Sequence, residues 1–154
     1  MENLINVFFN TDIIEKVWPF LLQGLWMTLL LSLTVVPLGL AGGLAVALAG
    51  HQGPRWLRWS TVVYVDFFRA FPPLVLLILI YFGIPFLGID MPKFISVAMG
   101  FLLNTSSYYG EVFRAGLESV PRGQMEAARS TGLSRAQALW HVVIPQATRN
   151  VLPE

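Results

Sequence analysis

The sequence predicts an all-α membrane protein, a polytopic helical bundle with three transmembrane helices and one short cytoplasmic helix. Two observations predict this class. The 154 residues are 55% hydrophobic and 12% charged, with a mean hydropathy of +0.63, whereas soluble domains carry about 25% charged residues. The apolar residues also form long uncharged runs, and a helix needs about 20 such residues to cross the hydrocarbon core.

We expect the first transmembrane helix at 17–50, a range without formal charge. The second is expected at 70–89, between Arg69 and Asp90, and its length matches one crossing. The third is expected at 94–117. Its uncharged run ends at Gly110, and the helix is expected to continue if the Glu111 side chain faces protein or reaches the interface.

The distribution of cations sets the expected orientation. The segment 51–69 is expected to be a loop or an interfacial helix. It carries arginines, as does the segment from 118 onward, whereas the segment 1–16 is net acidic. By the positive-inside rule the two basic segments are cytoplasmic, and the N-terminal segment 1–16 and the short loop 90–93 are external. The acidic start also lacks the positive charge of a signal peptide, so the apolar stretch after it is expected to remain as a membrane anchor.

The composition excludes several classes of function. A net charge of +1 gives no field that would attract nucleic acid. Without cysteine there is no disulfide and no thiolate metal site. His51 and His141 have no partner at ligand spacing, so no metal site is expected. The chain also lacks a phosphate-binding Gly-x-x-x-x-Gly-Lys-[Ser/Thr] loop and a convincing catalytic constellation, so it is not expected to be an enzyme.

Glycine and proline are frequent within the expected spans. Gly39 and Gly43 form a small-xxx-small pair that permits close approach of two helices. The alternative is that both residue types are simply commoner in membrane helices than in soluble ones.

The segment 118–134 contains the signals of a short, isolated helix. Pro121 suits the start of a helix and Gly132 suits its C-terminal end, while Ser134 and Gln137 form a capping box for the next helix. Between these stops Glu126 lies four residues after Arg122 and three before Arg129, close enough for ion pairs. Ala127 and Ala128 leave part of the surface nearly bare. The segment is either a docking element for another protein or a solvated amphipathic linker.

These residues resemble a known pattern. The series Glu126, Ala127, Ala128, Gly132, Val142, Ile144 and Pro145 resembles the EAA loop of ABC importer permeases, in which EAA is followed after three residues by Gly and after nine more by I-x-L-P. Val142 and Ile144 replace the Ile and Leu of that pattern. The run from Ser107 to Gln124 and the stretch from Tyr64 to Pro85 are similar to the polar amino acid permeases within this superfamily, with Ala70, Ser107 and Gly110 as departures.

The resemblance implies a division of labour. Two permease subunits, identical or paralogous, form the path through a bacterial inner membrane; a cytoplasmic ATPase supplies energy, and an external binding protein delivers the amino acid. Glu126, Ala127, Ala128, Gly132 and Pro145 would bind the ATPase, supported by Pro121, Arg122 and Arg129. Family members have five spans, so 135–154 is expected to be the start of a further helix in an incomplete permease. Glu154 departs from the Pro-Pro-Leu expected near this point.

The translocation path is harder to place. Asn104, Ser107, Tyr108, Glu111 and Arg69 are candidates for it. The polar run from Asn104 to Ser107 either binds solute or forms hydrogen bonds with neighbouring helices. Asp66 and Arg69, three residues apart, form either a gate or an interfacial pair.

Two other classes of function remain as alternatives. One is a membrane scaffold that holds a cytoplasmic partner without transport. The other is an ion-driven secondary transporter, which is disfavoured because ionisable residues are sparse in the expected spans.

Overall fold

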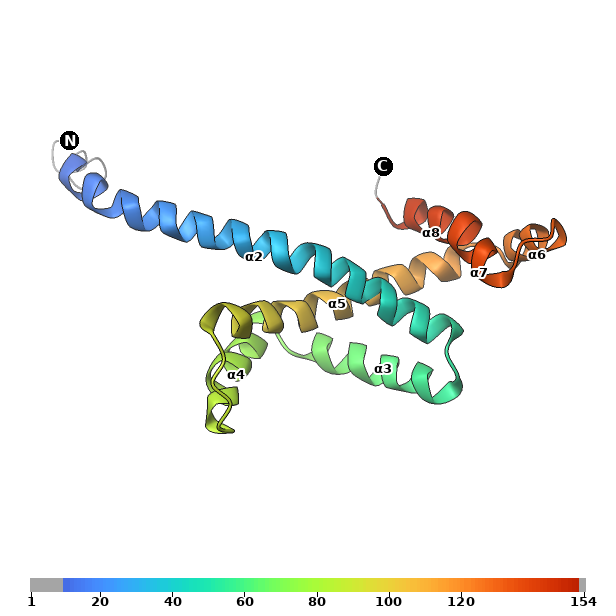
Figure 1. Cartoon of the computed structure of the whole chain (residues 1–154), viewed down its shortest axis with the longest axis horizontal. Helices are drawn as coiled ribbons and strands as arrows, with labels where there is room; N and C mark the ends of the chain where they lie inside the picture. The colour runs from blue at the N-terminus through green and yellow to red at the C-terminus, as the bar shows by residue number, and fades with distance from the viewer. Residues whose placement is uncertain (1–9, 153–154) are drawn as a thin grey trace. The chain divides into compact units, whose positions relative to one another are not determined.

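The computed structural model describes residues 10–152, which are helical apart from short connections (Figure 1). In chain order the elements are α2 (Thr11–Gln52), α3 (Arg55–Ala70), α4 (Pro73–Phe86), α5 (Lys93–Ser119), α6 (Arg122–Ser130), α7 (Arg135–Ala138), the π-helix η1 (Leu139–Val143) and α8 (Ile144–Val151). No strand occurs in residues 10–152, which confirms the all-α class. The expectations for residues 1–9, and for Pro153 and Glu154, lie outside the described residues.

By its internal contacts the chain divides into two units, Met1–Thr34 and Val35–Glu154. In the first unit, Asn10 caps the start of α2. Its Oδ1 accepts hydrogen bonds from the backbone N–H groups of Asp12 (3.1 Å) and Ile13 (3.3 Å), as N-terminal caps do. The large apolar side chains that follow, such as Phe20 and Leu33, are exposed. Such a surface is suited to lipid rather than to water.

Helix α5 is the centre of the second unit. Helices α3, α4 and α8 all pack against it. The part of α2 within this unit approaches α5 very closely, because a Cβ atom on Gly43 would lie 2.5 Å from Cβ of Tyr109 and 2.9 Å from N of Gly110. On Gly39 it would lie 2.7 Å from Cγ2 of Thr105. Of the two alternatives for the small-xxx-small pair, these distances favour a close helix contact.

The expected second span begins a few residues late and is preceded by a separate helix. The segment 51–69 contains a full helix, α3, that reaches Ala70, and the chain then breaks at Phe71 and Pro72 before α4 begins at Pro73. Phe71 is extended, with φ −97° and ψ 132°. The break has a local cause, because a proline forces the residue before it out of the helical region and has no N–H to donate. The range 70–89 thus contains a helix over Pro73–Phe86 rather than one helix over its whole length.

Among residues 10–152, α2 is by itself long and apolar enough to cross a bilayer. Helices α3 and α4 meet the same test only as a pair, and they are bent by 97° at their break. Helix α5 covers the third expected span, 94–117, and extends it by one residue at its start and two at its end. Three crossings, and the external position of the N-terminus, stay predictions.

A small apolar core fixes the C-terminal part of this unit. It joins Ala47 of α2 and Leu117 and Val120 at the end of α5 to Leu139, Val143 and Ala147. The capping box is present, since the Ser134 hydroxyl accepts from the N–H of Gln137 and the Gln137 side chain accepts from the N–H of Ser134. The π-turn at η1 precedes Pro145, which has no N–H for a helical hydrogen bond.

Candidate functional site

Helix α6 has the limits that the local sequence predicts. It runs from Arg122 to Ser130, directly after Pro121. At its other end the N–H of Gly132 donates to the carbonyl of Arg129 at 3.1 Å, and Gly132 has φ +92°. Only glycine adopts this backbone conformation without strain. The helix therefore ends where glycine permits a reversal of direction.

The two faces of α6 differ in burial. Ala128 is 8% exposed and lies on the side that packs against α7 and η1, and Met125 packs against the apolar core. Glu126 and Ala127 are exposed. The expectation that both alanines leave a bare surface is thus wrong for Ala128, which anchors the helix to the bundle. Glu126 and Ala127 remain available to a partner.

The expected ion pairs within α6 do not form. In residues 10–152 the salt bridges are those of Arg114 with Glu111 and Glu118, so Glu126 is paired with neither Arg122 nor Arg129. Spacing places these side chains on neighbouring surface positions, but exposed pairs gain little free energy and other orientations compete. All three side chains instead line a cleft.

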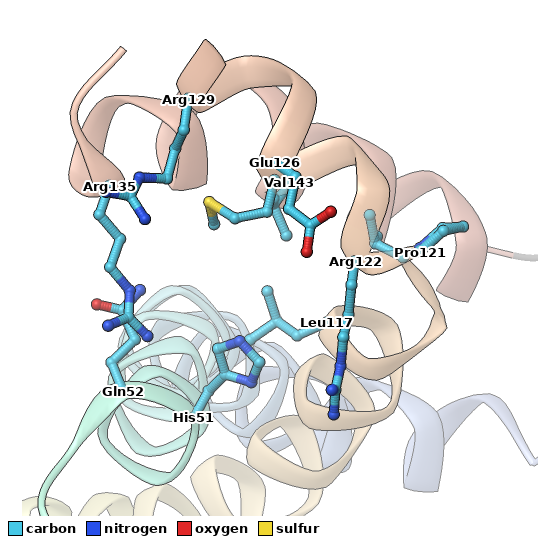
Figure 2. Close-up of a pocket in the computed structure, with 11 residues that line it drawn as sticks. His51, Gln52, Leu117, Pro121, Arg122, Glu126, Arg129, Arg135 and Val143 are labelled. Carbon is cyan, nitrogen blue, oxygen red and sulfur yellow. The ribbon is translucent and has the colours of Figure 1, made fainter. Parts of the chain in front are cut away.

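This cleft of about 520 Å³ lies between α6 and the C-terminal end of α2. Figure 2 shows Glu126 directed into it from α6 and His51 from the end of α2, with Leu117 at the apolar wall. Arg122, Arg129 and Arg135 bring three guanidinium groups to its rim. The cleft was missed in the sequence, because no local signal places residues 51 and 52 beside residues 122–135.

Pro145 lies in the first turn of α8, which packs against α5. The residues that match the EAA pattern are thus divided between two helices, with α6 bearing Glu126, Ala127 and Ala128, and α8 bearing Ile144 and Pro145. The apolar core lies between these two parts. The residues of the EAA pattern therefore belong to two helices that pack on the same apolar core, and they do not form a single exposed loop.

The polar run on α5 forms hydrogen bonds with α3. The Tyr64 hydroxyl lies 2.7 Å from Oγ of Ser106 and donates to the carbonyl of Leu103 at 3.2 Å, and Nδ2 of Asn104 donates to the carbonyl of Phe68 at 3.4 Å. Ser107 is fully buried, and its hydroxyl donates to the carbonyl of Asn104 at 2.6 Å. Of the two alternatives for this run, these contacts favour helix-to-helix hydrogen bonding over solute binding.

The charged path candidates are more exposed. The Arg69 guanidinium lies over the Tyr108 ring, 5.3 Å from its centroid, and not against Asp66. Arg114 donates to both carboxylate oxygens of Glu111, at 2.9 and 2.6 Å, and to Glu118 at 2.6 Å. Neither the gate nor the interfacial pair expected for Asp66 and Arg69 therefore forms. Among residues 10–152 no three His, Asp or Glu side chains are grouped as metal ligands.

Comparison with known proteins places the chain in a family. Residues 36–154 match the family described as "Binding-protein-dependent transport system inner membrane component". The chain belongs to this family. It is 37% identical over 145 residues to "Probable amino-acid ABC transporter permease protein YckA" of Bacillus subtilis (strain 168), covering 94% of this chain and 64% of that protein. It is 35% identical over 144 residues to "Probable glutamine ABC transporter permease protein GlnM" of the same organism, covering 94% of this chain and 67% of that protein.

A solved structure of an ABC transporter is also similar to this chain. The structure described as "Crystal structure of an amino acid ABC transporter with histidines" matches with a TM-score of 0.76 and 38% sequence identity. The match covers 90% of this chain and 64% of that one. The fold is therefore that of an ABC transporter permease, and the chain spans about two thirds of the length of these relatives.

Three residues of this inner membrane component were missed as contributors to the site. Tyr64 joins α3 to α5, and Gln146 and Asn150 on α8 reach the residues on either side of Pro121. Each forms its hydrogen bond with a residue more than 20 positions away in the sequence. The helical period placed them on faces, but it gave no indication of which helix each face meets.

Proposed function

We propose that the chain forms the membrane-spanning part of the permease subunit of an ABC importer that takes up a polar amino acid. In this proposal it lies in the inner membrane of a bacterium with its N-terminus outside, and it pairs with a second permease subunit. A separate cytoplasmic ATPase supplies the energy, and an extracytoplasmic binding protein delivers the solute.

The observation that carries the proposal is the presentation of α6. The helix is held by Ala128 and Met125, while Ala127 is exposed and the exposed Glu126 side chain lines the cleft beside α2. A nine-residue helix is too short to be stable alone, so its shape depends on this packing. A helix presented in this way suits a groove on a second protein. Closure of the ATPase dimer would then move α6 and, through it, the spans, provided that nucleotide favours one state over the other.

Gly132 provides a direct test of the docking role. Gly132→Val introduces a β-branched residue at φ +92°, which costs about 1–2 kcal/mol and displaces the end of α6. No atom lies within 4 Å of the added Cβ, so the effect comes from the backbone and not from a clash. We expect the variant to insert into the membrane but to lose ATPase from the purified complex.

Gly88 offers a matched control for this experiment. It is the other described residue with positive φ, +78°, also with open space around it, and it lies between α4 and α5. Gly88→Val carries a similar backbone penalty, and the complex purified with this variant should retain its ATPase. Gly132→Asn, which tolerates positive φ better, should recover part of the loss. Normal transport and a full complement of ATPase in Gly132→Val would refute the docking assignment.

The cytoplasmic position of α6 is tested by labelling. Because these 154 residues contain no cysteine, Glu126→Cys introduces a single thiol into this part of the permease, at an exposed position of α6, and the unsubstituted permease gives the background labelling. A membrane-impermeant maleimide should label it in inside-out vesicles from which the ATPase has been stripped, and not in intact spheroplasts. The opposite pattern would place α6 outside the cell and exclude ATPase docking.

The solute class rests on the resemblance to polar amino acid permeases and on the relatives, described as amino-acid and glutamine permeases. Acidic, amide and basic amino acids, histidine and cystine all belong to this class. Arg69, Tyr108 and Glu111 are our candidates for the path, because their side chains are exposed or half-buried. Asn104 and Ser107 are assigned to the contacts of α5.

Reconstitution separates the proposal from its alternatives. The complex of permease, ATPase and binding protein should hydrolyse ATP faster when the binding protein carries its amino acid. A scaffold would show no such stimulation. A secondary transporter would take up solute without ATP when an ion gradient is present.

A further inference from the structure

Two hydrogen bonds between side chains join α8 to the junction at which α5 is followed by α6. Nδ2 of Asn150 donates to Oγ of Ser119 at 2.8 Å, and Nε2 of Gln146 donates to Oε1 of Gln124 at 3.3 Å. Ser119 is the last residue of α5, and Gln124 lies in the first turn of α6. The two bonds therefore hold α8 to both sides of Pro121.

The Ser119 acceptor and the two donors on α8 are in defined positions. The Ser119 hydroxyl donates its hydrogen to the carbonyl of Gly116 at 2.7 Å, which leaves its lone pairs free for Asn150. Gln146 and Asn150 are four residues apart on α8 and so lie on one face of it. One helix face thus fixes two successive elements of the chain.

Apolar packing beneath these bonds prevents sliding between α5 and α8. A Cβ atom on Gly116 would lie 2.8 Å from the carbonyl oxygen of Ala147, so the two backbones are almost in contact. Leu117 and Val120 meet Val143 and Ala147 in the same core, against which Met125 of α6 packs. A core at normal packing density transmits displacement instead of absorbing it.

We propose that the end of α5, helix α6 and α8 move as one rigid lever, with Gln146 and Asn150 as positioning residues that fix the angle of α6. The inference rests on the proposed function, since the lever has a use only if α6 binds an ATPase. Without the two hydrogen bonds, α6 is attached through the short links 120–121 and 131–134 and through its apolar side. It would then tilt under load, and movement of the ATPase would be lost before it reached the spans.

The first test measures the amount of amino acid transported per ATP hydrolysed by the complete, reconstituted transporter. Asn150→Ala and Ser119→Ala should each lower this ratio about 3- to 10-fold, the effect of losing one hydrogen bond. The double variant should be no worse than either single variant, because both remove the same bond. Ser119→Thr retains the hydroxyl and should retain the ratio.

Ser60→Ala is the matched control. Ser60, like Ser119, donates to a carbonyl of its own helix, that of Trp56 at 3.0 Å, but it is exposed on α3 and distant in sequence from the lever. The Ser60→Ala transporter should carry as much amino acid per ATP hydrolysed as the unmodified transporter. Unchanged ratios in both single variants, or additive losses in the double variant, would refute the positioning role. ATPase bound per permease tests the proposed function separately, because it should not change in any of these variants.

A cross-link between α5 and α8 tests whether the two helices move together. Ser119→Cys and Asn150→Cys can be combined in this cysteine-free chain and joined by methylene bis-methanethiosulfonate. Both substitutions remove the hydrogen bond between these side chains, so before linking this variant should show the lowered ratio of the alanine variants. If α5 and α8 move together, linking should leave its transport rate unchanged or raise it towards that of the unmodified transporter. Loss of transport on linking, with the ATPase still bound, would show that α5 and α8 must separate during the cycle, and would overturn the proposal.

Discussion

Gly43→Ala should destabilise the permease by separating α2 from α5. The added Cβ would lie 2.5 Å from Cβ of Tyr109 and 2.9 Å from N of Gly110, whereas carbon atoms in contact prefer about 3.5–4.0 Å. One of the helices must therefore move by about 1 Å. Overpacking of this kind costs about 1–3 kcal/mol, and the better helix propensity of alanine offsets up to about 1 kcal/mol. We expect a net loss of about 1–2 kcal/mol.

The assay is thermal unfolding of the purified complete permease in one detergent, followed by the fluorescence of its tryptophans. A loss of 1 kcal/mol lowers the midpoint by about 2–4 °C for a chain of this size. Gly83→Ala in α4 is the control, because no atom lies within 4 Å of its added Cβ. It should leave the midpoint unchanged or raise it. If Gly43→Ala is as stable as Gly83→Ala, the close contact between α2 and α5 is refuted.

Two further predictions concern side-chain hydrogen bonds. Tyr64→Phe removes the hydroxyl that bonds to Ser106 and to the carbonyl of Leu103. It should lower the free energy of unfolding by about 1 kcal/mol in the same assay, and an unchanged midpoint would show that α3 is held by apolar contacts alone. Ser134→Ala removes the acceptor for the N–H of Gln137 and should cost about 1 kcal/mol of stability. Amide hydrogen exchange at Gln137 should become faster, and an exchange rate equal to that of the unsubstituted protein would contradict the capping box.

The limits of α6 could be predicted because they are set by local chemistry. Pro121, Gly132 and the pair Ser134 and Gln137 each act on residues within one turn of themselves. The same holds for the extent of α5, whose ends are marked by Pro92 and by Val120 with Pro121. Such signals do not depend on the rest of the fold.

The second span was expected to begin at residue 70, three residues before α4 begins, for a different reason. The run 70–89 is continuously apolar, and apolarity sets the expected number of spans without indicating the direction of the chain. Pro72 and Pro73 carried the necessary information. Their effect on Phe71 ends α3 and moves the start of the second expected span from residue 70 to Pro73, and α3 and α4 are bent by 97° at this break.

The contacts of the polar and charged side chains could not be predicted, because their partners are distant in sequence. Asn104 bonds to a carbonyl 36 residues away. Arg122 and Glu126 lie at pairing distance along the helix, yet both line the cleft beside His51 instead. Period and spacing define a helix face, and only the packing of whole helices determines what that face meets.

The close contact between α2 and α5 limits how these two helices can move relative to each other. Packed helices change register in steps of about one turn, and such a step would carry Val46 to the place of Gly43, where even a methyl group lacks room. A Cβ on Gly110 would in turn lie 3.0 Å from Cγ1 of Val46, so the neighbouring position is filled as well. In the proposed importer, a change between outward and inward access would tilt these two helices as a pair, and any sliding of helices would occur at other contacts.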